Sequence, residues 1–187
     1  MVAATTLIFN QYHVDLSTAF SAPSLAMKIF RTCFLTSNIP LLPNSLEAKV
    51  RNSSKGGAVQ VIKTTGANLH YSDVNSLYPY SMTTPMPIFY LDSLLAKDIN
   101  LDTFTGFIFA RIIVPDSVIP VVPFHSPNSD RLEYPKGKFE GLFYAEELRS
   151  AKSLGCEVTP IHGYLFSTKD LFYTYVHHFY NYLYKED

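Results

Sequence analysis

One short stretch, residues 70–79, combines an acid, a turn and a flat ring in a pattern that suits phosphate chemistry. Apolar and polar residues alternate up to Asp73, which predicts a strand that ends in a carboxylate, and Ser76 can cap a following helix. Such a carboxylate can bind a metal ion, and the backbone N–H groups at Ser76 and Leu77 can cradle a phosphate. Tyr78 places a ring beside the same pocket. The alternative for a lone acid of this kind is a helix cap beside a tyrosine packed in a core.

The elements that position Asp73 are predicted from the periodicity on either side of it. Residues 58–63 and 69–73 alternate around a turn at 64–68, which predicts a hairpin that delivers Asp73. The run 104–114 is almost continuously apolar and predicts a central strand, which Pro115 ends.

The rest of the chain predicts a mixture of helices and strands. The expected elements are an extended or frayed segment at 1–20, a helix from Ser21 to Phe34, a short helix over 44–51, a Pro-rich excursion with short edge strands at 115–140, a helix over 144–154, a strand over 157–166, an approximate capping box at Ser167 and Asp170, and a last helix over 171–183. This pattern predicts an α+β fold with an antiparallel sheet and helices packed on one side.

Composition excludes several kinds of protein. The 187 residues carry 15 Lys and Arg against 16 Asp and Glu, so the net charge of −1 provides no overall attraction for nucleic acid. Cys33 and Cys156 are far apart and the histidines are scattered, which argues against a zinc site. No apolar run reaches the roughly 18 residues of a membrane helix, and the start of the chain resembles neither a secretory signal nor an import sequence.

The spacing Asp73-x-x-Ser76-Leu77-Tyr78-Pro79 resembles the first metal-binding motif of family B DNA polymerases. Its flanks are most similar to the protein-primed branch found on linear mitochondrial plasmids and in some phages. The resemblance implies that Asp73 is a catalytic residue and, with the carbonyl of Val74, a ligand of Mg²⁺. It also implies that Ser76 and Leu77 bind the nucleotide triphosphate through backbone N–H groups, and that Tyr78 lies under the deoxyribose and excludes a 2′-hydroxyl.

A second loop, Arg51 to Gly57, matches the order of motifs in that family. Family members have a Tyr-x-Gly-Gly loop that contacts the DNA backbone, which makes Arg51, Lys55, Gly56 and Gly57 the expected DNA-binding residues. Ser54 stands where the family has tyrosine, so a stacking platform is missing here. Taken without the resemblance, Lys-Gly-Gly is more often an ordinary hairpin turn.

The resemblance extends over most of the chain and suggests three parts. Residues 1–50 resemble the end of the exonuclease region, 51–114 the palm with its first metal-binding motif, and 115–187 the palm insertion that contacts terminal protein and duplex in protein-primed enzymes, with the helices that follow. The second metal-binding motif, Asp-Thr-Asp, is not found; only Ser129-Asp130 comes near it. We therefore expect an internal segment of a polymerase.

The implied function is template-directed DNA synthesis, with primer-template DNA, dNTP and a terminal protein primer as partners and no membrane. Two Mg²⁺ ions need at least two acids, so the isolated chain is expected to be inactive. The alternatives are a non-catalytic module that binds nucleic acid or terminal protein through Arg51, Lys55, Lys136 and Lys138, and a decayed gene product that folds poorly. The resemblance also implies a mitochondrial location, with the gene inside the organelle.

Overall fold

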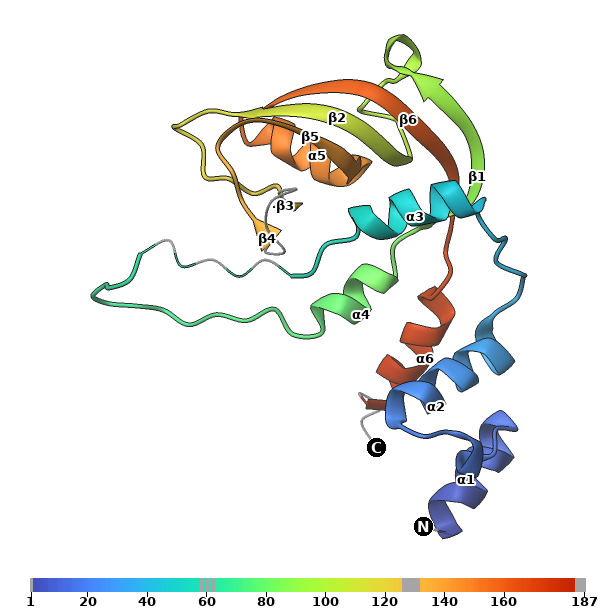
Figure 1. The fold of residues 1–187 in the computed structure, drawn as a ribbon. Helices are drawn as coiled ribbons and strands as arrows, with labels where there is room; N and C mark the ends of the chain where they lie inside the picture. The colour runs from blue at the N-terminus through green and yellow to red at the C-terminus, as the bar shows by residue number, and fades with distance from the viewer. Residues whose placement is uncertain (1, 58, 60, 62, 126–131, 184–187) are drawn as a thin grey trace. The chain divides into compact units, whose positions relative to one another are not determined.

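The computed structural model describes residues 2–57, 59, 61, 63–125 and 132–183 (Figure 1). The chain forms two compact units. We call Pro40–Ser72 with Pro87–Thr168 the sheet unit, and Met1–Ile39 with Asp73–Met86 and Lys169–Asp187 the helical unit. The resemblance predicted three parts, at 1–50, 51–114 and 115–187, which are defined by function. The two units are defined by compactness. They do not test the three-part division, which stays a prediction.

The sheet unit is built on a four-stranded sheet in the order β1-β6-β2-β5. The strands are β1 (Met86–Leu95), β2 (Gly106–Val114), β5 (Gly137–Tyr144) and β6 (Glu157–Lys169). Strand β2 pairs antiparallel with both β5 and β6, so the predicted central strand is confirmed, and it ends at Val114 before Pro115. A strand with a neighbour on each side and one covered face needs mostly apolar side chains. The sequence of β2 agrees, since it has no charged residue before Arg111.

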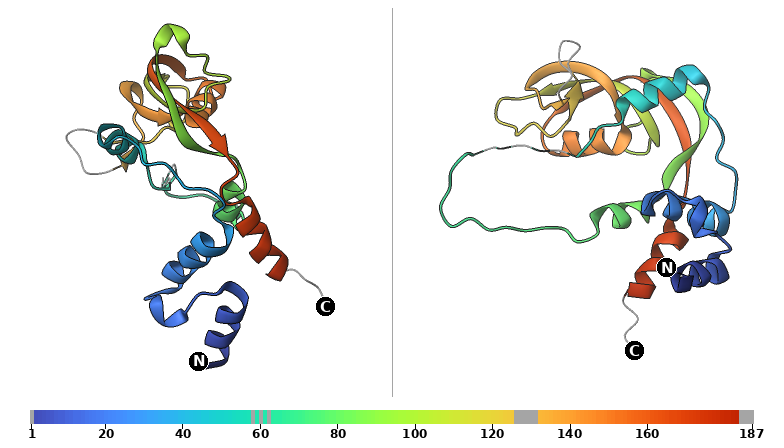
Figure 2. Two further views of the ribbon diagram at one scale, coloured as in Figure 1. Left: turned by 90° about the vertical axis from the view of Figure 1, so that its right-hand side faces the viewer. Right: turned by 60° about the horizontal axis from the view of Figure 1, so that its bottom comes forward.

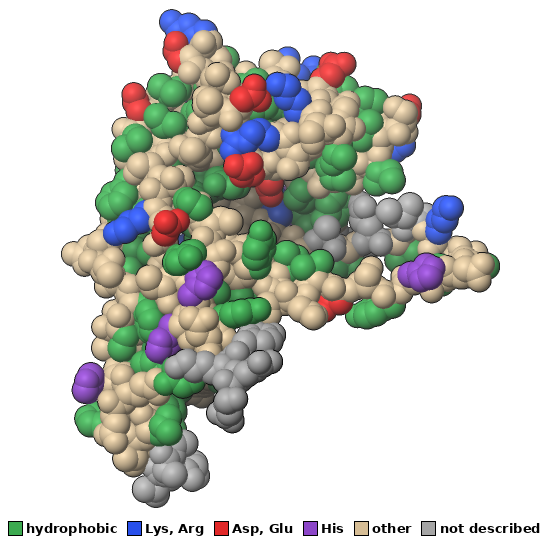
Figure 3. All heavy atoms as spheres, turned by 180° about the vertical axis from the view of Figure 1, so that it is seen from behind, with side chains coloured by type: hydrophobic (Ala, Val, Ile, Leu, Met, Phe, Trp, Pro, Cys, Tyr) green, Lys and Arg blue, Asp and Glu red, His purple; other side chains and the backbone are tan. Residues whose placement is uncertain are grey.

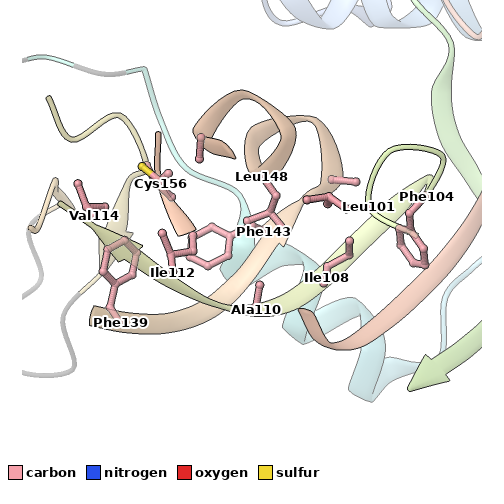
Figure 4. Packing of buried hydrophobic residues seen from close by; sticks show 13 residues of the cluster. Leu101, Phe104, Ile108, Ala110, Ile112, Val114, Phe139, Phe143, Leu148 and Cys156 are labelled. Carbon is pink, nitrogen blue, oxygen red and sulfur yellow. The ribbon is translucent and has the colours of Figure 1, made fainter. Parts of the chain in front are cut away.

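Helix α5 (Ala145–Ser153) covers one face of this sheet. Ile108, Ile112 and Leu148 are all 0% exposed, and Figure 4 shows them with Phe143 between β2, β5 and the helix. Burying each of these side chains contributes roughly 1.5–3 kcal/mol, so this layer is the main source of stability of the sheet unit. The prediction of a helix here, stopped by Gly155 at φ +97°, is confirmed.

Shorter elements complete the sheet unit. They are α3 (Asn44–Ser53), a 3-10 turn at Ala96–Asp98, β3 (Phe124–His125) and β4 (Leu132–Glu133). The two short strands pair with each other, as expected for the Pro-rich excursion, while residues 126–131 lie outside the described part of the chain.

The helical unit consists of short helices, which Figure 2 shows from two further sides. Aromatic side chains make up much of its core. Its elements are α1 (Val2–Tyr12), a 3-10 turn at Leu16–Thr18, α2 (Ala22–Ile29), a π-turn at Phe30–Phe34, α4 (Leu77–Met82) and α6 (Tyr173–Leu183). Ser21 caps α2 and Pro23 lies in its first turn, as predicted. Tyr175 and Phe179 of α6 pack against Phe34, which confirms that the periodic rings of the last helix form a core.

Two local predictions are wrong because tertiary contacts decide the conformation. Residues 2–12 are helical rather than extended, since Ile8 and Tyr12, four residues apart, pack on one helix face against the core of the helical unit. Ser167 lies inside β6 and caps no helix, and α6 begins only at Tyr173. The Phe166 N–H donates to the carbonyl of Thr105 at 2.9 Å, which keeps the chain extended there.

The predicted hairpin before Asp73 is also wrong for the described residues. Residues 58, 60 and 62 lie outside them, and 63–75 contain no strand. Leu69 and Tyr71 are 81% and 96% exposed, so the alternating pattern has no apolar layer to pack on. A lone two-stranded hairpin is marginal in water, and Asp73 therefore follows irregular chain rather than a strand.

Candidate functional site

The stretch Asp73–Tyr78 belongs to the helical unit and forms a turn that opens α4. Ser76 has left-handed backbone angles, φ 56° and ψ 35°, and its carbonyl accepts the N–H of Tyr80 at 2.9 Å. The predicted helix start is therefore confirmed. The predicted cap is wrong, since the Ser76 side chain makes no capping hydrogen bond, and a capping serine needs an extended backbone.

Every side chain of this stretch is exposed. Asp73 is exposed, Val74 and Leu77 are 64% and 49% exposed, and Tyr78 is 76% exposed. The alternative in which the acid lies beside a tyrosine packed in a core is therefore excluded. The carboxylate and the ring are both accessible to a ligand, which is what metal or nucleotide binding requires.

Asp73 fits Mg²⁺ as one ligand among several. A carboxylate is the hard oxygen donor that Mg²⁺ prefers, and the carbonyl of Val74 would add a second oxygen from the next residue. Among the described residues, no three His, Cys, Asp or Glu side chains are grouped closely enough to hold a metal ion. The described residues could thus contribute only some of the ligands of a metal site, and a complete site would need further acidic ligands.

The Arg51–Gly57 segment belongs to the sheet unit. Its first three residues form the last turn of α3, and Ser54 to Gly57 follow the helix. Arg51 pairs with Glu47 one turn back at 2.6 Å, an exposed pair worth about 0.3–0.5 kcal/mol. The Lys55 ammonium donates to the carbonyl of Asn52 at 2.6 Å. A Cβ added to Gly56 would meet nothing within 4 Å, so its backbone is open to a ligand. Gly57 is exposed as well.

Lys55 shares a cavity of about 560 Å³ with Glu147, which lies in the first turn of α5. Burial raises the pKa of the Glu147 carboxyl, and the Tyr144 N–H that donates to it at 3.2 Å opposes this effect. Burial lowers the pKa of Lys55, and the charge of Glu147 opposes that effect. The Glu147 carboxyl and the Lys55 ammonium therefore line the same cavity, and the charge of each affects the pKa of the other. This cavity lies beside the Gly56–Gly57 loop.

We expect Glu147→Gln to change how stability depends on pH. The folded pKa of Glu147 lies above its ordinary 4.5, so its contribution to stability is present below 4.5 and is lost as pH rises through the raised pKa. Glutamine does not titrate, and its side-chain oxygen can still accept the Tyr144 N–H. The free energy of unfolding of the variant, minus that of the wild type, should therefore rise in urea titrations as pH increases from 4.5 through the raised pKa.

Glu146→Gln is the matched control for this prediction. The hydrogen bond from Arg149 lowers the pKa of Glu146, so its contribution is present above 4.5 and is lost as pH falls. For Glu146→Gln, the free energy of unfolding of the variant minus that of the wild type should therefore fall as pH rises. Slopes of equal sign for the two variants would contradict the assignment.

A larger cavity of about 650 Å³ also lies in the sheet unit, and the sequence did not indicate it. His162 and Tyr164 of β6 and Phe109 of β2 contribute to its wall, together with Lys49 of α3. The alternation within β6 places His162 and Tyr164 on one face, but Lys49 is 115 positions away from Tyr164 in the sequence. Only the fold brings them together.

Charge is mixed on the face of the molecule seen in Figure 3, where Lys and Arg side chains lie among Asp and Glu. This mixture agrees with the net charge of −1. Among the described residues, no helix is both long enough and apolar enough to span a bilayer.

The whole chain, residues 1–187, matches the family of type B DNA polymerases of organelles and viruses. The chain belongs to this polymerase family. It is 32% identical over 175 residues to a probable DNA polymerase of Podospora anserina, which covers 90% of the chain and 14% of that protein. A probable DNA polymerase of Ascobolus immersus is 32% identical over 185 residues, with 93% of the chain and 15% of that protein covered.

Solved structures of phi29 DNA polymerase share the fold. Phi29 DNA polymerase complexed with primer-template DNA and incoming nucleotide matches 97% of the chain with a TM-score of 0.69 and 20% identity. The same polymerase complexed with single-stranded DNA matches 99% of the chain with a TM-score of 0.67. The chain spans about a third of that polymerase and about a seventh of the two fungal relatives. Family membership and the α+β fold expected from the sequence are thus confirmed.

Proposed function

We propose that this chain is a segment of a DNA-directed DNA polymerase that supplies Asp73 as one acidic ligand of a two-metal site. The observation that carries the proposal is the exposed turn Asp73–Tyr78, which keeps the complete motif spacing in a chain that belongs to this family from end to end. The bound ions would neutralise charge between the attacking and leaving oxygens of phosphoryl transfer.

The residues of the turn would divide the work of binding. The Asp73 carboxylate and the Val74 carbonyl would hold the ion. Ser76, which has left-handed backbone angles, and Leu77 would offer successive N–H groups to the triphosphate, an arrangement that favours anions. Tyr78, with its ring exposed, would lie under the deoxyribose and exclude a 2′-hydroxyl by its bulk.

DNA and terminal protein are the proposed macromolecular partners. The open backbone at Gly56 and Gly57, with Arg51 and Lys55 beside it, supports contact with the DNA backbone. Lys136 and Lys138 would contribute to binding terminal protein. The open Gly56 backbone also favours a second candidate function, which is DNA binding without chemistry. A mitochondrial location remains part of the proposal.

Mn²⁺ offers a direct test of the Asp73 site, because it accepts the same oxygen ligands as Mg²⁺ and broadens NMR signals of nearby nuclei. In the 187-residue chain, we expect Mn²⁺ to broaden the amide signals of Asp73 to Leu77, and Asp73→Asn to remove most of the effect. Asp98→Asn, which changes an exposed acid of the sheet unit, should leave the broadening unchanged. Primer extension by the isolated chain should stay undetectable, because further acids are needed.

Two outcomes would count against this function. Broadening that persists in Asp73→Asn would place the ion elsewhere. Absence of broadening, combined with DNA binding that weakens steeply with salt and is lost on charge reversal at Arg51 and Lys55, would favour the non-catalytic candidate instead.

A further inference from the structure

Part of the wall of the 650 Å³ cavity comes from the face of the sheet opposite α5, and part comes from Phe124 and Phe143, which pack on the α5 side. Ile108 and Ala110 of β2 are 0% exposed toward α5, so the alternate residue Phe109 points to the other face. Phe109 is paired with Leu142 on β5 and with His162 on β6, and all three line the cavity. The volume falls within the roughly 300–1,000 Å³ typical of small-molecule sites.

Polar side chains of the cavity are held by contacts with one another and, for His162, with Ser93 of β1. The Lys49 ammonium donates to the Tyr164 hydroxyl at 2.9 Å and lies 5.4 Å from the centre of its ring. The His162 Nε2 and the Ser93 hydroxyl are 2.7 Å apart, and the imidazole stands edge-on to Tyr164 at 4.8 Å between ring centres. Such mutual support fixes the positions of these groups before a ligand arrives, which reduces the entropy cost of binding.

An irregularity in the sheet lies next to these groups. Phe109 pairs with His162 but the next residue, Ala110, pairs with Pro160, so β6 has one extra residue, Ile161, at this point. A bulge of this kind re-aims the side chains beside it and is common next to binding sites. Here it sets the direction of His162, which lines the cavity wall.

The wall offers flat apolar surface together with positive charge. Phe109 is 37% exposed on a strand whose neighbouring positions are fully buried. Phe124 also lines the cavity, but its ring packs on Phe139 of the α5-facing core. Lys49 and Lys55 contribute two cations. Among the described residues of the wall, the one carboxylate is that of Glu140, which is paired with Arg111 at 2.7 Å and so does not cancel the lysines.

We propose that this cavity binds a nucleoside monophosphate, with the base on the Phe109 ring and the phosphate between Lys49 and Lys55. Stacking on aromatic side chains suits any base, and two ammonium groups match the dianionic phosphate monoester in charge. A triphosphate carries about twice that charge, and inorganic phosphate leaves the ring unused. This site uses none of the residues of the Asp73–Tyr78 turn, although it shares Lys55 with the proposed DNA-binding loop.

The test is a calorimetric titration of the 187-residue chain with dAMP in EDTA, which removes any contribution from metal bound at Asp73. We expect saturable 1:1 binding. Deoxyadenosine, which lacks the phosphate, and deoxyribose 5-phosphate, which lacks the base, should each bind at least about tenfold more weakly. Phe109→Ala and Lys49→Met should weaken dAMP binding by about tenfold each, because they remove the stacking surface and one of the two cations.

Lys97→Met is the matched control, because Lys97 is an exposed lysine of the sheet unit outside the cavity, and it should bind dAMP like the wild type. Far-UV circular dichroism melts of each variant separate loss of the site from loss of the fold. No detectable binding of dAMP, equal affinity for inorganic phosphate, or affinity unchanged by both cavity variants in a folded chain would each overturn the proposal. Binding of a short single strand but not of dAMP would also overturn it, in favour of a strand-binding groove.

Discussion

Gly106→Ala will lower the free energy of unfolding of the sheet unit by about 2–5 kcal/mol. Gly106 begins the central strand β2 with φ +126°, a backbone angle that residues with a Cβ rarely adopt. An added Cβ would lie 2.2 Å from the carbonyl oxygen of Tyr164 and 3.2 Å from the nitrogen of Phe166. Both atoms are backbone of the paired strand β6, so the sheet itself would have to move.

Two other glycines separate the causes of this loss. Gly137 has φ +79° but an added Cβ would meet nothing within 4 Å, so Gly137→Ala should cost only the backbone strain of about 1–2 kcal/mol. Gly56 has open space and no positive φ, so Gly56→Ala should change stability by less than about 1 kcal/mol. Urea unfolding followed by far-UV circular dichroism measures all three. Equal losses at Gly106 and Gly137 would contradict the role of the close approach to β6.

Leu148→Ala will cost about 2–5 kcal/mol of unfolding free energy, because it empties the centre of the layer between α5 and the sheet. Leu148 is 0% exposed and belongs to the same cluster as Ile108, Ile112 and Phe143. Removing it loses the transfer free energy of three carbon atoms and leaves a cavity that the rigid sheet cannot close.

Leu154 provides the matched control at the end of the same helix. It is 53% exposed, so Leu154→Ala should change stability by no more than about 0.5 kcal/mol. The comparison keeps the chemistry of the substitution constant and changes only the burial. A loss at Leu148 no larger than the loss at Leu154 would mean that α5 does not pack on the sheet.

Both predictions bear on function through the sheet unit. This unit carries the Gly56–Gly57 loop, the Lys55–Glu147 cavity and the proposed nucleotide cavity, and all three depend on where α3 and α5 pack on the sheet. Variants that loosen the core should therefore weaken binding at these sites together. A variant of a residue that lines one cavity alone, such as Phe109, should act on that site alone.

Local sequence determined the elements whose energetics are local. The helix over Ala145–Ser153 follows from acids in its first turn and a glycine at its end, and α2 follows from Ser21 and Pro23. The family follows from the spacing of Asp73, Ser76, Leu77 and Pro79, because a binding motif is contiguous when one turn supplies its groups. These features need no knowledge of distant residues.

Tertiary structure decided the features that depend on distant partners. Alternation before Asp73 predicted a hairpin, but alternation produces a strand only where one face has a layer to pack on, and Leu69 and Tyr71 have none. Residues 2–12 are helical because Ile8 and Tyr12 pack in the core of the helical unit. The cavity beside Phe109 needed the contact of Lys49 with Tyr164 and a bulge in β6, and neither leaves a periodic signal in the sequence. The sequence therefore identified the exposed turn and the family, while the sheet pairing created the cavity.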